Sequence, residues 1–216
     1  MKKTGIILSF LGFSFCFGQS AVLYNLNNNR LLSNSVNKIG VGESADNDNY
    51  DGSPFLEKEF LPSMIKGESG AFLLRYNIYN DEIILKNDDK YYKIPKEEAD
   101  YFKINNEYVV RLINGKYYID SSSDKNNYVI VRKENITFTP GKVAENTYDQ
   151  ARPPKFSRTK PDYFLFDMAK KVITPLKKDE IKALFPNKSE ELDQNFKKNK
   201  FKNIDDLNSL LSIIAG

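Results

Sequence analysis

Short runs of apolar and aromatic residues, separated by clusters of Asn, Asp and Gly, fill the chain from residue 55 to residue 139. Runs of this length, rich in Tyr, Phe, Ile and Val and bounded by turn residues, are typical of β-strands. The runs that we expect to be strands are 72–79, 82–86, 91–94, 101–104, 107–113, 116–120 and 128–133. Asn114-Gly115 separates two of them and favours the positive φ angles of a type I′ turn, which predicts a hairpin.

The short spacing of these runs predicts an antiparallel meander that forms a small barrel or sandwich. Four prolines follow in 140–161, the first of them in a Pro-Gly pair, and we interpret this segment as a connector rather than sheet, because proline removes a ladder donor. Residues 162–216 predict a hairpin, 163–166 against 172–173, and then short helices. The expected fold class is therefore α+β.

Caps and periodicity together predict the helices. One short helix is expected over about 179–185, where Pro186 ends it, and a second begins at Ser189 as its N-cap. The last helix begins at Asn203 as N-cap, and its apolar residues repeat with helical spacing. They are Ile204, Leu207, Leu211 and Ile214. We expect this stripe to dock on the hairpin around Phe164 and Phe166; in the alternative, Leu207 and Leu211 bind another protein.

The first residues have the layout of a secretory signal peptide. Lys2 and Lys3 precede an apolar run over 6–17, and Cys16 and Gly18 are the small residues of a cleavage site before Gln19. The run is too short to favour a transmembrane helix. We therefore expect cleavage between Gly18 and Gln19 and export, to the periplasm first, with the cell surface or secretion as alternatives. Residues 19–54, rich in Asn, Ser, Asp and Gly, predict an extended lead-in.

The residues that are missing restrict the chemistry. The chain has no His, and its one Cys, Cys16, lies in the predicted signal peptide. A Ser-His-Asp triad, a cysteine nucleophile and an ordinary zinc site are therefore excluded. We expect a protein that is not an enzyme and has no cofactor. The alternative is a glycan-cleaving enzyme that works with carboxylates alone.

A weak calcium motif lies in the lead-in. Asn47, Asn49, Asp51 and Gly52 resemble the start of an EF-hand loop, although its first position is Asn, and Asp46 and Asp48 add charge beside them. Lys58 stands where the bidentate glutamate belongs. We therefore interpret the segment as an acidic loop, with Asp46, Asp48 and Asp51 as the weak metal candidates.

Tyrosines on the predicted strands raise a second binding hypothesis. Tyr76 and Tyr79 belong to a group that could present rings to a sugar or to another protein. Tyrosine is also a common strand residue, so packing within the sheet is the simpler interpretation. A carbohydrate-binding module remains the alternative in which Tyr76 and Tyr79 act.

Charge is distributed unevenly along the chain. Residues 19–150 hold 16 basic and 20 acidic side chains, a net charge of −4, whereas residues 151–216 hold 14 and 9, a net charge of +5. Solvated lysine-rich helix faces explain this most simply, and a binding face for an acidic partner is the alternative. No nucleic-acid-reading motif accompanies the basic residues, so nucleic acid is not an expected partner.

Several segments carry a resemblance to a known group. They are Gly52 to Leu56, Leu74 to Glu82, Phe138 to Lys142 and Ala183 to Pro186 with the lysine-rich helices beside it. Over most of the chain after residue 18, the sequence resembles a group of uncharacterised exported proteins of Bacteroidota, chiefly flavobacteria. The resemblance implies export from a Gram-negative cell and implies no activity. The sequence thus predicts a cell-envelope binding or accessory protein that contacts another envelope protein, with the partner and the oligomeric state left open.

Overall fold

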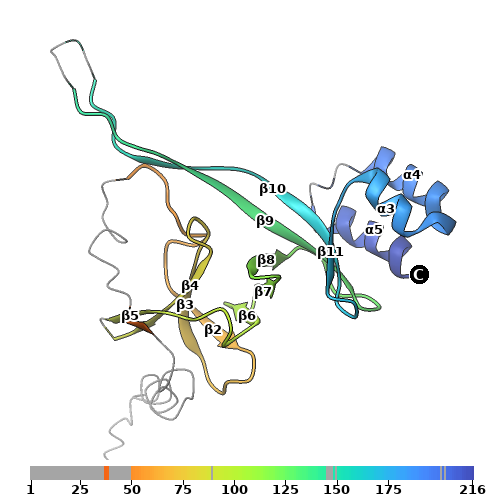
Figure 1. Ribbon diagram of the computed structural model, residues 1–216, viewed down its shortest axis with the longest axis horizontal. Helices are drawn as coiled ribbons and strands as arrows, with labels where there is room; N and C mark the ends of the chain where they lie inside the picture. The colour runs from red at the N-terminus through yellow and green to blue at the C-terminus, as the bar shows by residue number, and fades with distance from the viewer. Residues whose placement is uncertain are drawn as a thin grey trace, which may run out of the picture.

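The computed structural model describes residues 37–38, 50–88, 90–144, 148, 150–199, 201 and 203–216. Within this part of the chain, eleven strands form one antiparallel sheet, and the helices follow it (Figure 1). The strands are β1 (Asn37–Lys38), β2 (Leu61–Ile65), β3 (Phe72–Asn77), β4 (Glu82–Asn87), β5 (Lys90–Lys93), β6 (Tyr101–Ile104), β7 (Tyr108–Ile113), β8 (Lys116–Asp120), β9 (Tyr128–Thr139), β10 (Lys155–Asp167) and β11 (Val172–Pro175). The helical segments are α3 (Lys178–Leu184), η2 (Pro186–Lys188), α4 (Ser189–Lys198) and α5 (Ile204–Ala215).

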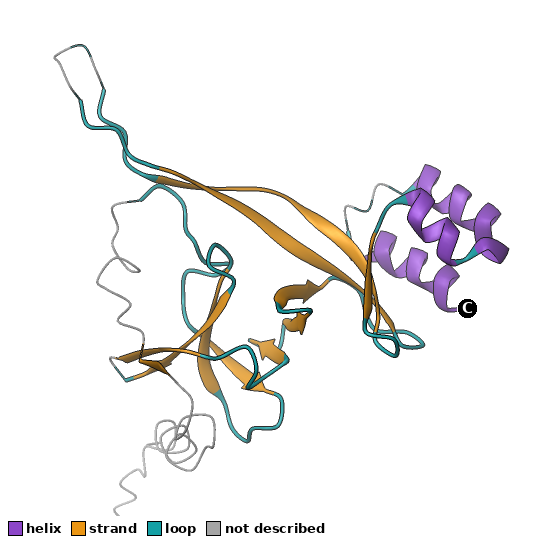
Figure 2. Ribbon diagram, viewed as in Figure 1, coloured by secondary structure: helices purple, strands orange, loops and turns teal. Residues whose placement is uncertain are grey.

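The strand order is β1-β5-β4-β3-β2-β6-β7-β8-β9-β10-β11. Two meanders begin side by side, at β2 and β6, and run in opposite directions across the sheet. The segment from β5 to β6 connects the two meanders, and three strands, β4, β3 and β2, lie between its ends in the strand order. Figure 2 shows the helices gathered at one end of the long β9–β10 pair. The predicted α+β class, an antiparallel β meander with short helices, is confirmed.

The hairpin at Asn114-Gly115 is confirmed. These two residues join β7 to β8, and both have positive φ, 49° and 77°. A type I′ turn needs positive φ at both central positions, and its twist matches that of the flanking strands. The local sequence therefore determines this turn without help from the rest of the fold.

The larger hydrophobic core lies inside the curve of the sheet. Three strands lie between β3 and β8 in the strand order, yet the rings of Tyr76 on β3 and Tyr117 on β8 approach edge to face, with centroids 5.8 Å apart. This contact requires the sheet to curl. The buried side chains inside the curl include Phe72, Leu74, Tyr76, Ile83, Leu85, Phe102, Ile104, Val110, Tyr117 and Ile119.

A second core joins the helices to the β9–β10 pair. Its buried residues are Ile130, Leu165, Ile181, Leu192, Leu207, Leu210, Leu211 and Ile214. Leu207 and Leu211 are only 3% and 1% exposed, so the stripe on α5 docks within the chain, as the sequence predicts. Asn203 caps α5 as predicted: its side chain accepts a hydrogen bond of 2.8 Å from the backbone N–H of Asp206.

The predicted docking face is wrong. The α5 stripe packs on Leu165 and Ile130, whereas Phe164 and Phe166 belong to a third cluster with Val129 and Val131. Successive strand residues point to opposite faces, so Leu165 points away from Phe164 and Phe166. Two members of the stripe also differ from the prediction. Ile204 is 57% exposed and does not belong to it, whereas Leu210, which was not predicted, is buried in it.

The connector predicted over 140–161 is wrong from residue 155 onward, because β10 begins at Lys155 and pairs with β9. Pro161 lies inside β10, at an irregularity where the register shifts between Thr159 and Asp162. A proline is tolerated at a bulge, since the residue there has no ladder bond to donate. β9 likewise continues to Thr139, beyond the predicted end at residue 133.

Candidate functional site

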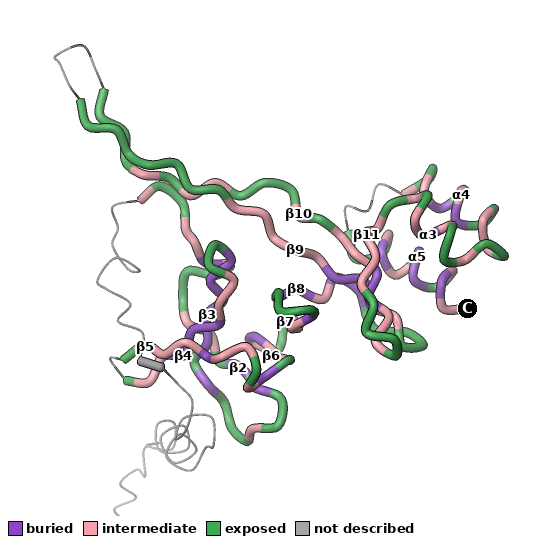
Figure 3. The backbone as a smooth tube through the Cα atoms, viewed as in Figure 1, coloured by how far each residue is buried: buried purple, intermediate pink, exposed green. Residues whose placement is uncertain are grey.

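The far ends of β9 and β10 form an arm, which we define as residues 136–144 and 150–159. Figure 2 shows this two-stranded ribbon running away from the curled sheet, on the side opposite the helices. Figure 3 shows that the outer part of the arm is exposed on both strands. Val143 is 82% exposed and Tyr148, beyond the paired residues, is 98% exposed. Ile136 at its base packs against the larger core, and the outer part of the arm therefore presents surface that no core covers.

Aromatic side chains gather at the root of the arm. Phe138 on β9 and Phe156 on β10 face each other, with ring centroids 4.9 Å apart. Tyr79, from the turn after β3, contacts both rings, and Tyr50 contacts Phe156. Tyr79 is 47% exposed and Phe138 is 38% exposed. We call Tyr50, Tyr79, Phe138 and Phe156 the aromatic cluster; it leaves apolar ring surface in contact with solvent.

Residues between β1 and β2 hold the root of the arm in place. Asp51 pairs with β10 beside Lys155: its N–H donates to the Pro154 oxygen at 2.9 Å, and its oxygen accepts from Phe156 N–H at 2.8 Å. Gly52 has φ of 80°, and a Cβ there would lie 2.2 Å from the Phe156 oxygen. Only glycine allows this close approach.

Arg158 completes this attachment. Its guanidinium donates to the backbone oxygens of Phe55 and Leu56, the latter at 2.7 Å. The arm therefore starts from a fixed base rather than from a free hairpin.

Of the two tyrosines named by the sugar-binding hypothesis, only one is accessible. Tyr76 is 2% exposed and lies in the core, so its ring cannot face a sugar or a partner. Tyr79 belongs to the aromatic cluster. Tyr79 lies beyond the end of β3, so the alternation of side chains along that strand does not determine where its ring points.

A partly buried ionic cluster lies around Asp81 and includes Lys133 of β9. Its carboxylate accepts hydrogen bonds from the Tyr76 hydroxyl at 2.8 Å, from Lys96 at 2.6 Å and from Lys133. The backbone N–H of Tyr117 donates to the same carboxylate at 3.2 Å. These contacts tie the turn before β4 to β8 and β9 across the curl of the sheet.

Charge and burial act on the pKa values of this cluster in opposite directions. Burial opposes ionisation of Asp81, but hydrogen bonds from Lys133 and Lys96 outweigh it and hold its pKa below the ordinary value. Burial lowers the pKa of Lys133, and the contacts with Asp81 offset this only in part. Burial first, and the Asp81 charge second, raise the pKa of Tyr76. The donors converge on one carboxylate, and Lys96 and Lys133 also donate to the backbone oxygens of Gly115 and Tyr117, so the cluster has a structural role.

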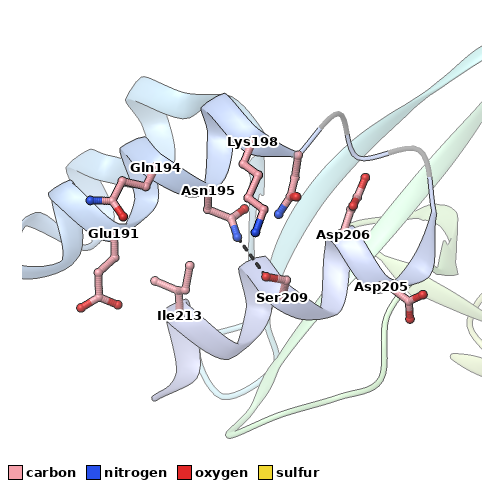
Figure 4. Close-up of a pocket in the computed structure, with 9 residues that line it drawn as sticks. Glu191, Gln194, Asn195, Lys198, Asp205, Asp206, Ser209 and Ile213 are labelled. Atoms are coloured by element: carbon pink, nitrogen blue, oxygen red, sulfur yellow. Dashed lines mark hydrogen bonds between the residues drawn. The ribbon is translucent and has the colours of Figure 1, made fainter.

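A polar pocket of about 370 Å³ lies between α4 and α5 (Figure 4). Asn195 is only 7% exposed; its amide nitrogen donates to the Ser209 hydroxyl at 3.1 Å. Its side-chain oxygen has no hydrogen-bond partner in the described part of the chain and is shielded from solvent. A ligand in the pocket therefore cannot reach this oxygen without moving the helices.

The structure describes only one of the three metal candidates. Asp46 and Asp48 lie outside the described residues. Asp51 is described, is exposed, and has its backbone engaged with β10. Among the described residues, no group of three His, Cys, Asp or Glu side chains is placed to hold a metal ion. Gly18 and Gln19, the predicted cleavage site, also lie outside the described residues.

The sequence does not predict the aromatic cluster. Its pattern places Phe156 in a connector and ends the preceding strand before Phe138. The signal that was present is the run from Ile136 to Thr139, in which β-branched and aromatic residues follow one another. Tyr79 was predicted as a candidate. The other rings reach it only through the pairing of β9 with β10, which is a long-range contact that the local sequence does not reveal.

Comparisons with known proteins give no further assignment. No protein-family model matches the chain, and neither the curated proteins nor the solved structures contain a match. Among the described residues, no helix has the length and apolar character needed to cross a membrane. The function must therefore be argued from the arm and its surroundings.

Proposed function

We propose that this protein is an exported, non-catalytic binding protein of the cell envelope, and that it holds another envelope protein through the arm. The observation that carries the proposal is the aromatic cluster at the root of the arm, with Tyr79 and Phe138 exposed to solvent. Exposed apolar patches on soluble proteins mark interaction sites, and aromatic side chains are enriched among the residues that dominate binding energy.

The charge of the arm supports a protein partner with acidic groups. The sequence from residue 136 to residue 160 holds five basic and two acidic residues. Arg152 and Lys155 are exposed and take part in none of the ion pairs of the described residues. Complementary charge speeds association and disfavours wrong partners.

A carboxylate-only glycan-cleaving enzyme is the alternative. It needs two carboxyl groups facing each other across a cleft, one of them with a raised pKa. Asp81 has the opposite shift and is surrounded by lysines, so it does not suit the role of the acid. The pocket between α4 and α5 is lined by carboxylates, so it supplies the residues to test. If a preparation cleaves glycans, Asp205→Asn and Asp206→Asn should not change the rate.

Site-specific photo-crosslinking tests the proposal. The exposed Thr139, at the end of β9, is replaced by p-benzoylphenylalanine, and in a matched control the same residue replaces Met64 on β2, which is 52% exposed. In envelope preparations of the native host, we expect the Thr139 position to crosslink to one protein and the Met64 position to crosslink to none.

A second substitution makes the test specific for the aromatic cluster. Tyr79→Ser should abolish the crosslink from position 139, whereas Leu184→Ser, at a 50% exposed position on α3, should leave it intact. Equal crosslinking from positions 139 and 64, or a crosslink that survives Tyr79→Ser, would refute binding through the arm.

A further inference from the structure

The backbone of β9 along the arm points hydrogen-bonding groups away from β10. Phe156 on β10 donates its N–H to the Asp51 oxygen at 2.8 Å, and therefore away from β9. In an antiparallel pair, two residues opposite each other either exchange both hydrogen bonds or both point outward. Phe138 is opposite Phe156, so its own N–H and C=O point to the outer edge of β9.

The other end of β9 gives the same orientation. The Ile130 oxygen accepts from Ser121 N–H at 2.8 Å, on the side of β9 that faces β8. Because strand residues alternate with a period of two, Ile136 and Phe138 point their backbone groups to that same side. Among the described residues, β8 pairs with β9 only at Val131 and Arg132, and no other strand continues this edge beyond them. Within the described residues, no hydrogen bond reaches the backbone of Ile136 or Phe138 on this edge.

Among the described residues, the opposite edge of the arm is protected, whereas this one is not. On β10, the backbone of Asp51 accepts from the outward N–H of Phe156 and donates to the Pro154 oxygen, and Pro161 at the bulge has no N–H to offer. Natural proteins use such devices to prevent strand addition at exposed edges. On β9, the run from Ile136 to Thr139 is β-branched and aromatic and carries no charge, proline or bulge.

We propose that the edge of β9 over residues 135–139 accepts an extended segment of the partner protein as an additional strand, with acidic residues alternating with apolar ones. The proposal rests on the proposed function and specifies how the arm binds. Main-chain hydrogen bonds to Ile136 and Phe138 supply affinity, and side chains at alternate positions supply specificity.

The two faces of the arm determine this alternation. Ile136 and Phe138 lie on the face of the aromatic cluster, so every second residue of the added strand meets apolar surface. Thr139 and its cross-strand neighbour Lys155 lie on the other face, where an acidic residue of the added strand is favoured. A second copy of this chain would bring two basic arms together, so like charges disfavour pairing of the arm with itself.

Amide hydrogen exchange followed by NMR tests the mode of binding. The probe is a synthetic nine-residue peptide of alternating Val and Glu with blocked ends. Its binding should slow exchange at the amides of Ile136 and Phe138 by about tenfold or more, since these N–H groups gain partners. The amides of Thr137 and Thr139 already point to β10 and should not change. Protection elsewhere, equal protection at all four amides, or no protection would overturn the proposal.

Matched variants and peptides separate the backbone contact from side-chain contacts. Phe138→Ala removes the ring and keeps the N–H, whereas Phe138→Pro removes both without breaking a bond to β10. The peptide should bind Phe138→Pro about tenfold more weakly than Phe138→Ala, because one main-chain hydrogen bond is lost. A peptide of alternating Val and Lys should not bind. Equal binding to the two variants would refute strand addition. The exchange test uses the unmodified protein, so it remains valid if Phe138→Pro perturbs the arm.

The outcomes distinguish this inference from the proposed function. If position 139 crosslinks to a protein but the peptide leaves Ile136 and Phe138 unprotected, the arm binds through side chains and strand addition is wrong. If the peptide protects these amides but position 139 captures no protein, the edge accepts strands and the proposed function is wrong.

Discussion

The Asp81 cluster allows a quantitative prediction for Asp81→Asn. The Asp81 side chain is 19% exposed, and two lysines, Lys96 and Lys133, pair with it. The substitution leaves two ammonium groups beside a neutral amide. Breaking a buried ion pair by removal of one partner costs about 3–5 kcal/mol. Because the site is partly exposed and asparagine retains an acceptor oxygen, we expect a loss of about 3 kcal/mol in the free energy of unfolding.

The same substitution should change the dependence of stability on pH. The pKa of Asp81 in the folded protein is lowered below 3.8. A carboxyl group with a lowered pKa stabilises the fold when the pH lies above its unfolded pKa, and this contribution is lost as the pH falls through the folded pKa. The difference between the unmodified protein and Asp81→Asn should therefore be full at pH 7 and should shrink below about pH 4.

Urea unfolding followed by circular dichroism at pH 7 and pH 3 measures both effects. Asp100→Asn is the matched control, because Asp100 pairs with Lys66 at 3.3 Å and both side chains are 64% exposed. An exposed pair of this kind contributes about 0–1 kcal/mol. If Asp81→Asn costs no more than Asp100→Asn, or if its cost is the same at both pH values, the role assigned to the cluster is wrong.

Three further predictions concern the tail, the root of the arm and the N-terminus. Leu207→Ala should cost about 2–4 kcal/mol of unfolding free energy because the side chain is buried in the second core, whereas Ile204→Ala, at a 57% exposed position, should cost less than about 0.5 kcal/mol; equal losses would contradict the packing of α5. Gly52→Ala should speed exchange of the Phe156 amide by about tenfold or more, because its Cβ would clash with the Phe156 oxygen and break the pairing with Asp51; unchanged exchange would count against it. Intact-mass analysis of the exported protein should give a chain that begins at Gln19, and a mass that retains residues 1–18 would disprove the cleavage site.

Local patterns predicted the elements whose determinants are local. The run 101–104 matches β6, and Asn114-Gly115 forms the turn between β7 and β8. Asn203 caps α5 because its side chain can accept from an N–H three residues away. Each of these signals depends on neighbours in the sequence, so no knowledge of the tertiary fold was needed.

The elements that the sequence did not predict depend on distant partners. β2 contains Pro62 and was not expected as a strand, yet it pairs with β3 on one side and with β6 on the other. The docking face of α5 was assigned incorrectly because alternation along 163–166 offers two apolar faces and cannot tell which one the helices cover. Only the position of β11 and the helices relative to β10 settles that choice.

The arm is the part of the fold that departs most from what local sequence patterns predict. We take this departure as a sign of function. A two-stranded ribbon without a core of its own is marginally stable, so Phe138, Phe156 and Tyr79 would stabilise the fold more if they were buried. Instead, the chain uses Gly52 and the Arg158 contacts to fix the root, and it leaves the rings and one strand edge open. Proteins depart from local consistency chiefly at functional sites. A segment that is attached this firmly at its base and exposed beyond it suits the binding role that we propose, and the unprotected edge of β9 is where the proposed additional strand would pair.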